Sequence, residues 1–151
     1  MNSTPNFNIG KQTFKHVADL EWFEGALLSL FREQDTSKLF LMHWVDIEEE
    51  CHRWLFFPIA PRALRLYLEG KLSNQDLFFL DASPTVKILD INGGLKLHKI
   101  TEVEKNSLPK DFRPSKDGYF QKELCNGFNE IISLLKKYSL EAGKYEWAMA
   151  A

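Results

Sequence analysis

The chain has few of the features from which a function is usually inferred. Only two of its 151 residues are cysteines, Cys51 and Cys125, and no CxxC spacing joins them. The sequence therefore suggests neither a disulfide framework nor a zinc ribbon, and free thiols in a reducing compartment are expected. No apolar run resembles a signal sequence or approaches the ~20 residues that span a bilayer. These absences favour a cytoplasmic protein.

The chain also lacks an excess of charge of either sign. Its 19 basic and 21 acidic residues leave a formal net charge of -2, which argues against a nonspecific nucleic-acid binder. Walker A, dinucleotide-binding, GxSxG and HExxH motifs are absent. Aromatic residues, by contrast, are abundant at 13% of the chain, and such side chains fill cores and interfaces.

Apolar runs of strand length, separated by turn-forming residues, predict antiparallel strands. Residues 13–23 permit a helix or a strand, and we favour a strand. Clearer strands are expected at 26–31, 38–46, 51–59, 85–91 and 95–101. Asn92 and Gly93 favour a type I′ turn between the last two, because both residue types tolerate a positive φ.

Three helical segments are expected. Pro61 suits the first turn of a short helix that stops at Gly70, and Ser73 with Asp76 resembles the start of a second one. A longer amphipathic helix is predicted at 120–140, ending near Gly143, because its apolar residues are three or four positions apart. Residues 103–119 form a long polar connection, which suggests a mobile loop or a lid.

These elements predict one α+β domain over residues 1–151, with 1–11 as a flexible start. Its antiparallel β-sheet has five or six strands, a short helical segment after the fourth strand, and a long C-terminal amphipathic helix packed on the sheet. The strands around residues 38–59 carry large apolar groups on both faces. Helices of this chain or a second subunit must therefore cover both faces.

The hairpin at 38–59 also has the chain's most chemistry-like stretch, HWVDIEEECHRW. A three-residue loop would set Trp44 opposite Trp54, whereas a two-residue loop would set Trp44 opposite Arg53. The acidic residues lack EF-hand spacing, and adjacent Cys51 and His52 point to opposite strand faces. We therefore expect no metal site, no cofactor and no catalytic site in this stretch, although His43, Cys51 and His52 have the right residue types.

Other charged residues offer weaker hypotheses. Asp81 or Asp90 with the later EVEK stretch has the residue types of a nuclease but lacks the spacing. Two groups of basic residues could form patches for single-stranded nucleic acid, although ordinary surface charge explains them better. These groups are Arg62, Arg65 and Lys71, and Lys87, Lys96 and Lys99.

The runs EGALLSLF, KLFLMHWVD, CHRWLFFPI and LRLYLEGKLSNQDLFF resemble a family of small bacterial proteins classed as a domain of unknown function. The resemblance covers about residues 21–80. It implies a bacterial or phage-associated cytosolic accessory protein, and it carries over no activity or catalytic residues.

We therefore interpret the chain as a non-enzymatic protein–protein interaction module, such as an adaptor, immunity or antitoxin-like subunit. Its partner would be a basic protein or a second copy of the chain. The expected contact residues are Trp44, Glu48, Glu49, Glu50, Arg53 and Trp54. One alternative is a small hydrolase or nuclease built around Asp46, His52 or Asp90. Another is a small-ligand sensor with residues 103–119 as a lid.

Overall fold

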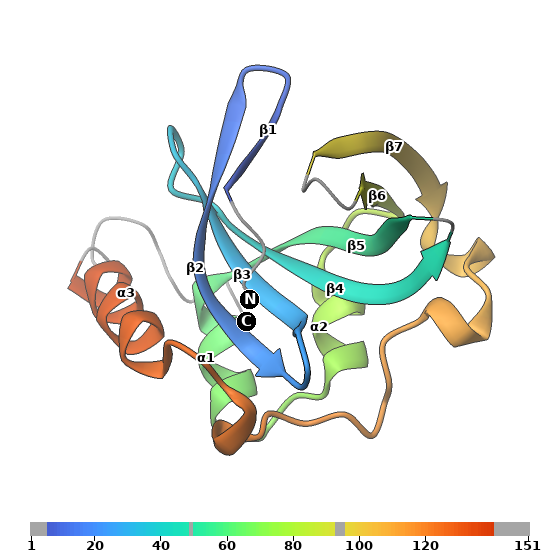
Figure 1. Ribbon diagram of the computed structural model, residues 1–151. Helices are drawn as coiled ribbons and strands as arrows, with labels where there is room; N and C mark the ends of the chain where they lie inside the picture. The colour runs from blue at the N-terminus through green and yellow to red at the C-terminus, as the bar shows by residue number, and fades with distance from the viewer. Residues whose placement is uncertain (1–5, 49, 93–95, 141–151) are drawn as a thin grey trace.

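A single seven-stranded antiparallel sheet forms the centre of the protein, and each strand pairs with the next one in sequence. The computed structural model describes residues 6–48, 50–92 and 96–140. The strands are β1 (Phe7–Ile9), β2 (Gln12–Trp22), β3 (Ala26–Glu33), β4 (Leu39–Glu48), β5 (Cys51–Ile59), β6 (Thr85–Asn92) and β7 (Leu97–Glu104). The sheet curls into a nearly closed barrel, with β1 and β7 rising on either side of its opening (Figure 1).

The curl is explained by irregularities in β2, the longest strand. Its pairing with β3 shifts between His16 and Ala18, again between Asp19 and Glu21, and once more before Trp22. Bulges of this kind bend a strand and increase its twist. The bulges therefore allow the sheet to curl and to enclose its own concave face.

Three helices lie on the outer face of the sheet: α1 (Pro61–Leu68), α2 (Asn74–Leu80) and α3 (Phe128–Leu140). The two short helices confirm the sequence prediction. Pro61 opens α1, and Ser73 and Asp76 form a reciprocal capping box at the start of α2. Among the described residues, no helix is long and apolar enough to cross a membrane.

The curled sheet explains why its strands are apolar on both faces. An outer core, which includes Leu41, Leu55, Leu64, Phe78 and Ile131, lies between the sheet and the helices. An inner core fills the concave face with Phe14, Phe31, Met42, Trp54, Phe56, Leu89 and Ile91. The helices therefore cover the outer face of the sheet, and the curled sheet encloses its own inner face.

The prediction of five or six strands was wrong, because β1 lies in the stretch that we expected to be a flexible start. Its Phe7 ring stacks on Phe14 at 5.2 Å and meets Phe31 and Phe56 edge to face at 5.0 and 5.4 Å. Burying this ring in an aromatic cluster stabilises a strand of only three residues. Phe7 and Ile9 do alternate around Asn8, but a strand of three residues is too short to show a strand period in the sequence.

The prediction of a long C-terminal helix was also wrong, because α3 begins only at Phe128. Residue 126 instead forms an antiparallel bridge with Asp19 of β2, and Gly127 has a φ of 92°. A Cβ at Gly127 would lie 2.8 Å from the Cβ of Ala18. Close contact with β2 therefore breaks the helical period. Residues 93–95 of the predicted turn, and Gly143, lie outside the described residues.

The connection after β7 is packed against the rest of the protein. Lys105 and Leu108 are both buried. Backbone N–H groups at the start of α2 donate to this segment, from Asn74 to Gly118 O at 2.7 Å and from Gln75 to Ser115 O at 3.1 Å. The segment therefore satisfies backbone donors at the start of α2, and its own backbone is not free as that of a lid would be.

Candidate functional site

The β4–β5 hairpin combines a short tip with a bulge. Glu48 pairs with Cys51 at the tip, and the register then shifts by one residue between Trp44 and Asp46. The shift sets Trp44 opposite Trp54, as a three-residue loop would have done. The sequence prediction derived the register from loop length alone and did not include a bulge.

Three of the expected contact residues are engaged within the protein. Trp54 is only 6% exposed, and the half-buried Trp44 donates its Nε1 proton to His52 Nδ1 at 2.9 Å. Arg53 donates from Nε and Nη2 to the two carboxylate oxygens of Asp90 at 2.8 and 3.3 Å. These side chains hold the hairpin against β6 and the inner core.

The acidic tip lies at the end of the same hairpin, next to these residues in the register. Glu50 is exposed, and Ile47 beside it is 52% exposed. The side chain of Glu48 and all of Glu49 lie outside the described residues. Asp46 accepts a hydrogen bond from the backbone N–H of Ile47 at 2.7 Å. The tip therefore presents Ile47 and Glu50 to solvent.

The candidate metal and catalytic residues of this hairpin do not converge. His43 pairs with Leu28 and Leu55 of the outer core, its Nδ1 is buried without a hydrogen-bond partner, and burial lowers its pKa from 6.5 to about 4. His52 is exposed and accepts from Trp44. Across the described parts of the chain, no group of three or more His, Cys, Asp or Glu residues is placed to hold a metal ion.

The other cysteine is poorly suited to act as a nucleophile. Burial, with the nearby carboxylates of Asp19 and Glu130, raises the pKa of Cys125 to about 11. The thiolate is the nucleophilic form of cysteine, so this thiol is in its unreactive form at neutral pH.

The residues of the nuclease hypothesis are occupied by structural contacts. Lys105, only 4% exposed, donates from Nζ to Phe78 O at 2.8 Å, to Asp81 O at 3.1 Å and to Asp81 Oδ2 at 3.3 Å. Asp90 is held by Arg53. We call the contacts of Lys105 the lysine latch, because they tie the end of α2 to the end of β7.

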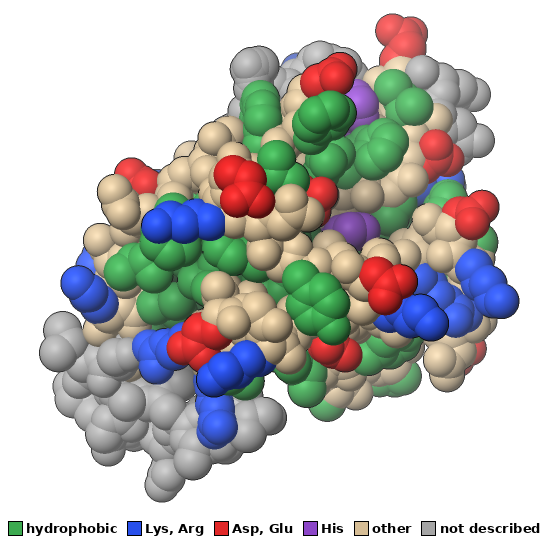
Figure 2. All heavy atoms as spheres, turned by 90° about the horizontal axis from the view of Figure 1, so that it is seen from below, with side chains coloured by type: hydrophobic (Ala, Val, Ile, Leu, Met, Phe, Trp, Pro, Cys, Tyr) green, Lys and Arg blue, Asp and Glu red, His purple; other side chains and the backbone are tan. Residues whose placement is uncertain are grey.

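The predicted basic patches are interrupted by acidic partners. Lys71 lies 3.1 Å from the carboxylate of Glu69, and across β6 and β7 Lys87 is opposite Glu102 and Asp90 opposite Lys99. The underside of the molecule likewise mixes acidic, basic and apolar side chains (Figure 2). Neither patch therefore forms an uninterrupted basic surface.

A cleft of about 290 Å³ opens where β5 separates from β6. Pairing between these strands ends at Phe56 and Lys87, although β5 continues to Ile59. Pro58 lies in the part of β5 beyond this pairing, where its missing N–H takes nothing from the β5–β6 ladder. We call this cavity the seam cleft; its lining residues are Ile9, Gln12, Phe14, Lys38, Phe40, Phe56, Phe57, Pro58, Asp81, Ser83, Thr85, Val86, Lys87 and Glu102.

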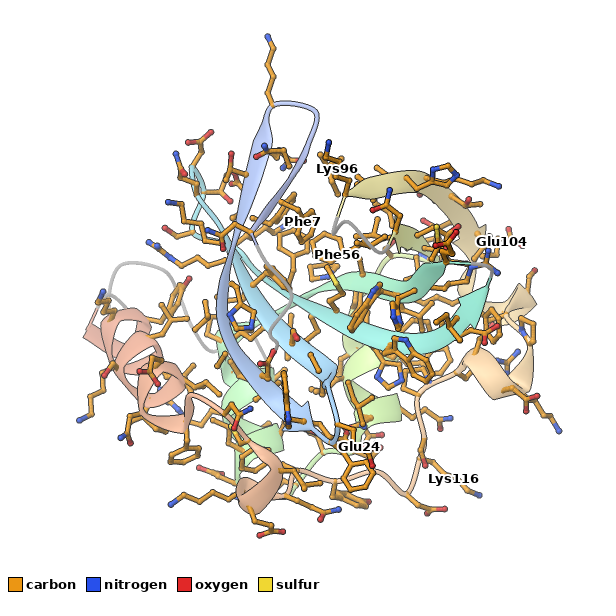
Figure 3. The ribbon with its side chains drawn as sticks, in the orientation of Figure 1. Phe7, Glu24, Phe56, Lys96, Glu104 and Lys116 are labelled. Atoms are coloured by element: carbon orange, nitrogen blue, oxygen red, sulfur yellow. The ribbon has the colours of Figure 1, made fainter. Side chains whose placement is uncertain are left out.

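The seam cleft has an aromatic wall. Phe40 and Phe56 stack with centroids 5.0 Å apart and an interplanar angle of 8°, and the edge of Phe14 meets both rings. Phe14 and Phe56 are buried, whereas Phe40 is half-buried. Figure 3 shows Phe56 beside Phe7 in the hollow between the β1–β2 and β6–β7 hairpins. Residues of both edge strands, Ile9 and Glu102, line the same cleft.

The rim of the seam cleft carries two exposed lysine side chains, Lys38 and Lys87. Glu102 accepts from Thr85 Oγ1 at 2.6 Å, and Asp81 is part of the lysine latch. Lys38 and Lys87 are exposed, and their ammonium groups have no partner among the described residues. Glu102 lies opposite Lys87 across β6 and β7, although no ion pair joins them, so Lys38 is the rim cation most available to an anion.

Sequence reasoning missed Phe40, Phe56 and Lys38 as a group. The available signal was Pro58, which cannot donate to a β5–β6 ladder, close to Phe40 and Phe56 on two paired strands. Comparisons with protein-family models, with curated proteins and with solved structures found no match.

Proposed function

We propose that this protein binds a small organic anion with a flat apolar body in the seam cleft. The observation that carries the proposal is the stacked Phe40–Phe56 wall beneath two rim lysines without partners. Ligand sites generally combine apolar walls with a few placed polar groups, and they occur at the mouths of β-barrels. This is the small-ligand hypothesis from the sequence, without residues 103–119 as a lid.

The dimensions and charges of the cleft narrow the ligand class. Its volume of about 290 Å³ is near the small end of known ligand pockets, which suits a molecule of one or two rings. A planar ring system would lie against the exposed side of Phe40 and gain an offset stacking interaction. A carboxylate or sulfonate would then be near Lys38 and Lys87.

The probe that tests this chemistry is 1-anilinonaphthalene-8-sulfonate, which joins aromatic rings to one sulfonate. We expect saturable binding of one probe to the folded protein at neutral pH, measured by fluorescence. Because exposed ion pairs contribute up to about 1 kcal/mol each, Lys38→Gln with Lys87→Gln should weaken binding about tenfold. Phe40→Ala should weaken it further by removing the stacking surface.

The matched control is Lys99→Gln with Lys116→Gln, which makes the same charge change away from the cleft. It should leave probe affinity unchanged. Thermal melting of each variant would confirm that the protein remains folded. Equal affinity in the cleft and control variants would contradict the proposal, as would fluorescence that appears only when the protein begins to melt.

A second candidate is the interaction module expected from the sequence, now limited to the hairpin tip. The observation that favours it is the exposure of Ile47 beside the acidic Glu50. The variant Ile47→Ser with Glu50→Lys should lose a basic protein partner captured from the native host. If the same proteins are captured by wild type and variant, this candidate fails.

We also propose a cytoplasmic location. Both cysteines, Cys51 and Cys125, are free thiols, which supports a reducing compartment. Fractionation of the native host, followed by immunoblotting, would test the location directly.

A further inference from the structure

A second cavity, of about 420 Å³, lies between α3 and the outer face of β2 and β3. We call it the α3 groove, defined by Lys15, His16, Arg32, Glu130, Ser133 and Lys137. Figure 1 shows α3 beside β2, at the side of the molecule away from β7. The groove shares no lining residue with the seam cleft.

The charged side chains that line the α3 groove are mostly positive, whereas the chain as a whole has a negative formal net charge. It brings together three permanent cations, Lys15, Arg32 and Lys137, with one carboxylate, Glu130. None of these three cations has a carboxylate within ion-pair distance among the described residues. This concentration of positive charge occurs in a chain whose formal net charge is -2.

Two of the cations are paired across neighbouring strands. Lys15 of β2 lies directly opposite Arg32 of β3 in the register of the sheet. Like charges in this arrangement repel one another and destabilise a sheet. A bound anion would turn this repulsion into two attractive contacts, which gives the pair a reason to be present.

Arg32 and His16 are held in place before any ligand arrives. Arg32 donates from Nη2 to Ser37 Oγ at 2.8 Å, and its Nε is buried without a partner in the described part of the chain. His16 Nε2 donates to the buried Asp19 carboxylate at 2.8 Å, and Ser29 Oγ donates to the same oxygen at 2.7 Å. Arg32 therefore enters the groove in a fixed orientation, whereas the ring of His16 packs edge to face against Phe31 of the inner core.

We propose that the α3 groove binds the phosphate group of a small phosphorylated molecule that also carries hydroxyl groups. A phosphate has the negative charge and the three terminal oxygens to engage several cations, whereas a carboxylate has one charge and two oxygens. The Ser133 hydroxyl adds a donor for a phosphate oxygen. Glu130 is placed to accept from a sugar hydroxyl, and a cavity of this size holds a single small molecule.

The probe is ribose 5-phosphate, titrated into the full chain by isothermal calorimetry at constant ionic strength. We expect one binding site for ribose 5-phosphate, weaker binding of inorganic phosphate, and none of ribose. Lys137→Gln, on the exposed side of α3, should weaken ribose 5-phosphate binding about tenfold, because hydrogen bonds to charged groups are the stronger ones. Lys99→Gln on β7 is the matched control and should bind normally.

Lys15→Gln provides a second test that does not depend on the strength of one contact. Removing the repulsion with Arg32 should raise the melting temperature of the ligand-free protein while lowering its affinity for ribose 5-phosphate. A melting temperature that falls together with affinity would indicate a structural role and overturn the proposal. So would the absence of heat at millimolar ribose 5-phosphate, or wild-type affinity in Lys137→Gln. None of these three results would alter the expectation for the seam cleft, which the naphthalene probe tests separately.

Discussion

Acidification should destabilise this protein through His43, a residue that lines neither of the two proposed ligand cavities. His43 lies opposite Leu28 and Leu55 in the sheet and is half-buried as a residue, but its Nδ1 is buried without a partner in the described residues. Burial penalises the charged imidazolium, and this lowers the pKa of His43 from 6.5 to about 4.

The sign and the size of the effect follow from proton linkage. Between about pH 6.5 and pH 4 the unfolded chain binds a proton at this histidine that the folded chain does not bind. The stability contributed by neutral His43 is therefore complete above pH 6.5 and is lost as the pH falls to about 4. A shift of this size corresponds to about 3 kcal/mol of unfolding free energy, because one pKa unit is worth about 1.4 kcal/mol.

The measurement is urea unfolding of wild type and His43→Leu from neutral pH down to about pH 4. Leucine suits the apolar surroundings and cannot titrate, so the difference between the two proteins isolates this residue. Wild type should lose up to about 3 kcal/mol relative to the variant. His98→Gln, at an exposed position on β7, controls for the loss of a surface histidine.

Carboxylates titrate in part of the same pH range, since burial raises the pKa of Glu21 above 4.5, but both proteins contain them and their effects cancel. Hydrogen bonds from the Thr36 hydroxyl and from the backbone of Thr36 and Asp35 lower the pKa of Glu33 below 4.5, so its contribution is lost at still lower pH. Both proteins contain Glu33, and its effect cancels. Parallel stability curves for wild type and His43→Leu would refute the reasoning.

Three further predictions concern the packing of the fold. Gly127→Ala should cost about 2–3 kcal/mol by circular-dichroism melts, because a positive φ adds to the clash with Ala18. Gly70→Ala has a φ of 78° but no atom nearby, so it should cost only about 1 kcal/mol; equal losses would argue against the clash. Lys105→Met leaves the lysine latch acceptors unpaired and should lower unfolding free energy in urea by about 2–4 kcal/mol, a loss that Lys110→Met should not reproduce. Ser73→Ala removes the α2 cap and should cost about 1 kcal/mol by thermal melting, whereas no change would show that the capping box is energetically silent.

Local chemistry was sufficient to predict the short elements. Ser73 and Asp76 predicted the capping box from three-residue spacing, and Gly70 predicted the end of α1, since each signal depends only on neighbouring residues. The C-terminal helix failed for the opposite reason. Its period continues through Gly127, and the shortening comes from a contact with Ala18, more than a hundred positions earlier in the chain.

Predictions of the candidate sites failed for the same reason as the long helix, because they depended on contacts between distant parts of the chain. Trp44 and Trp54 looked like an interaction surface because alternation in a strand does not reveal whether the sheet curls over that face. The bulges of β2, which make it curl, have no clear signal in the sequence. Lys105, although it appeared in a charged stretch, could not be predicted as buried because its acceptors lie on a different element.

The strand order has a consequence for how the chain reaches its native state. Every ladder of the sheet joins strands that are consecutive in sequence, so the meander can form hairpin by hairpin with little loop-closure entropy at each step. The bridge between Asp19 and Asn126 is different, because it joins segments near the two ends of the chain. We expect the docking of α3 to be a late step of folding, and the α3 groove to appear only with it.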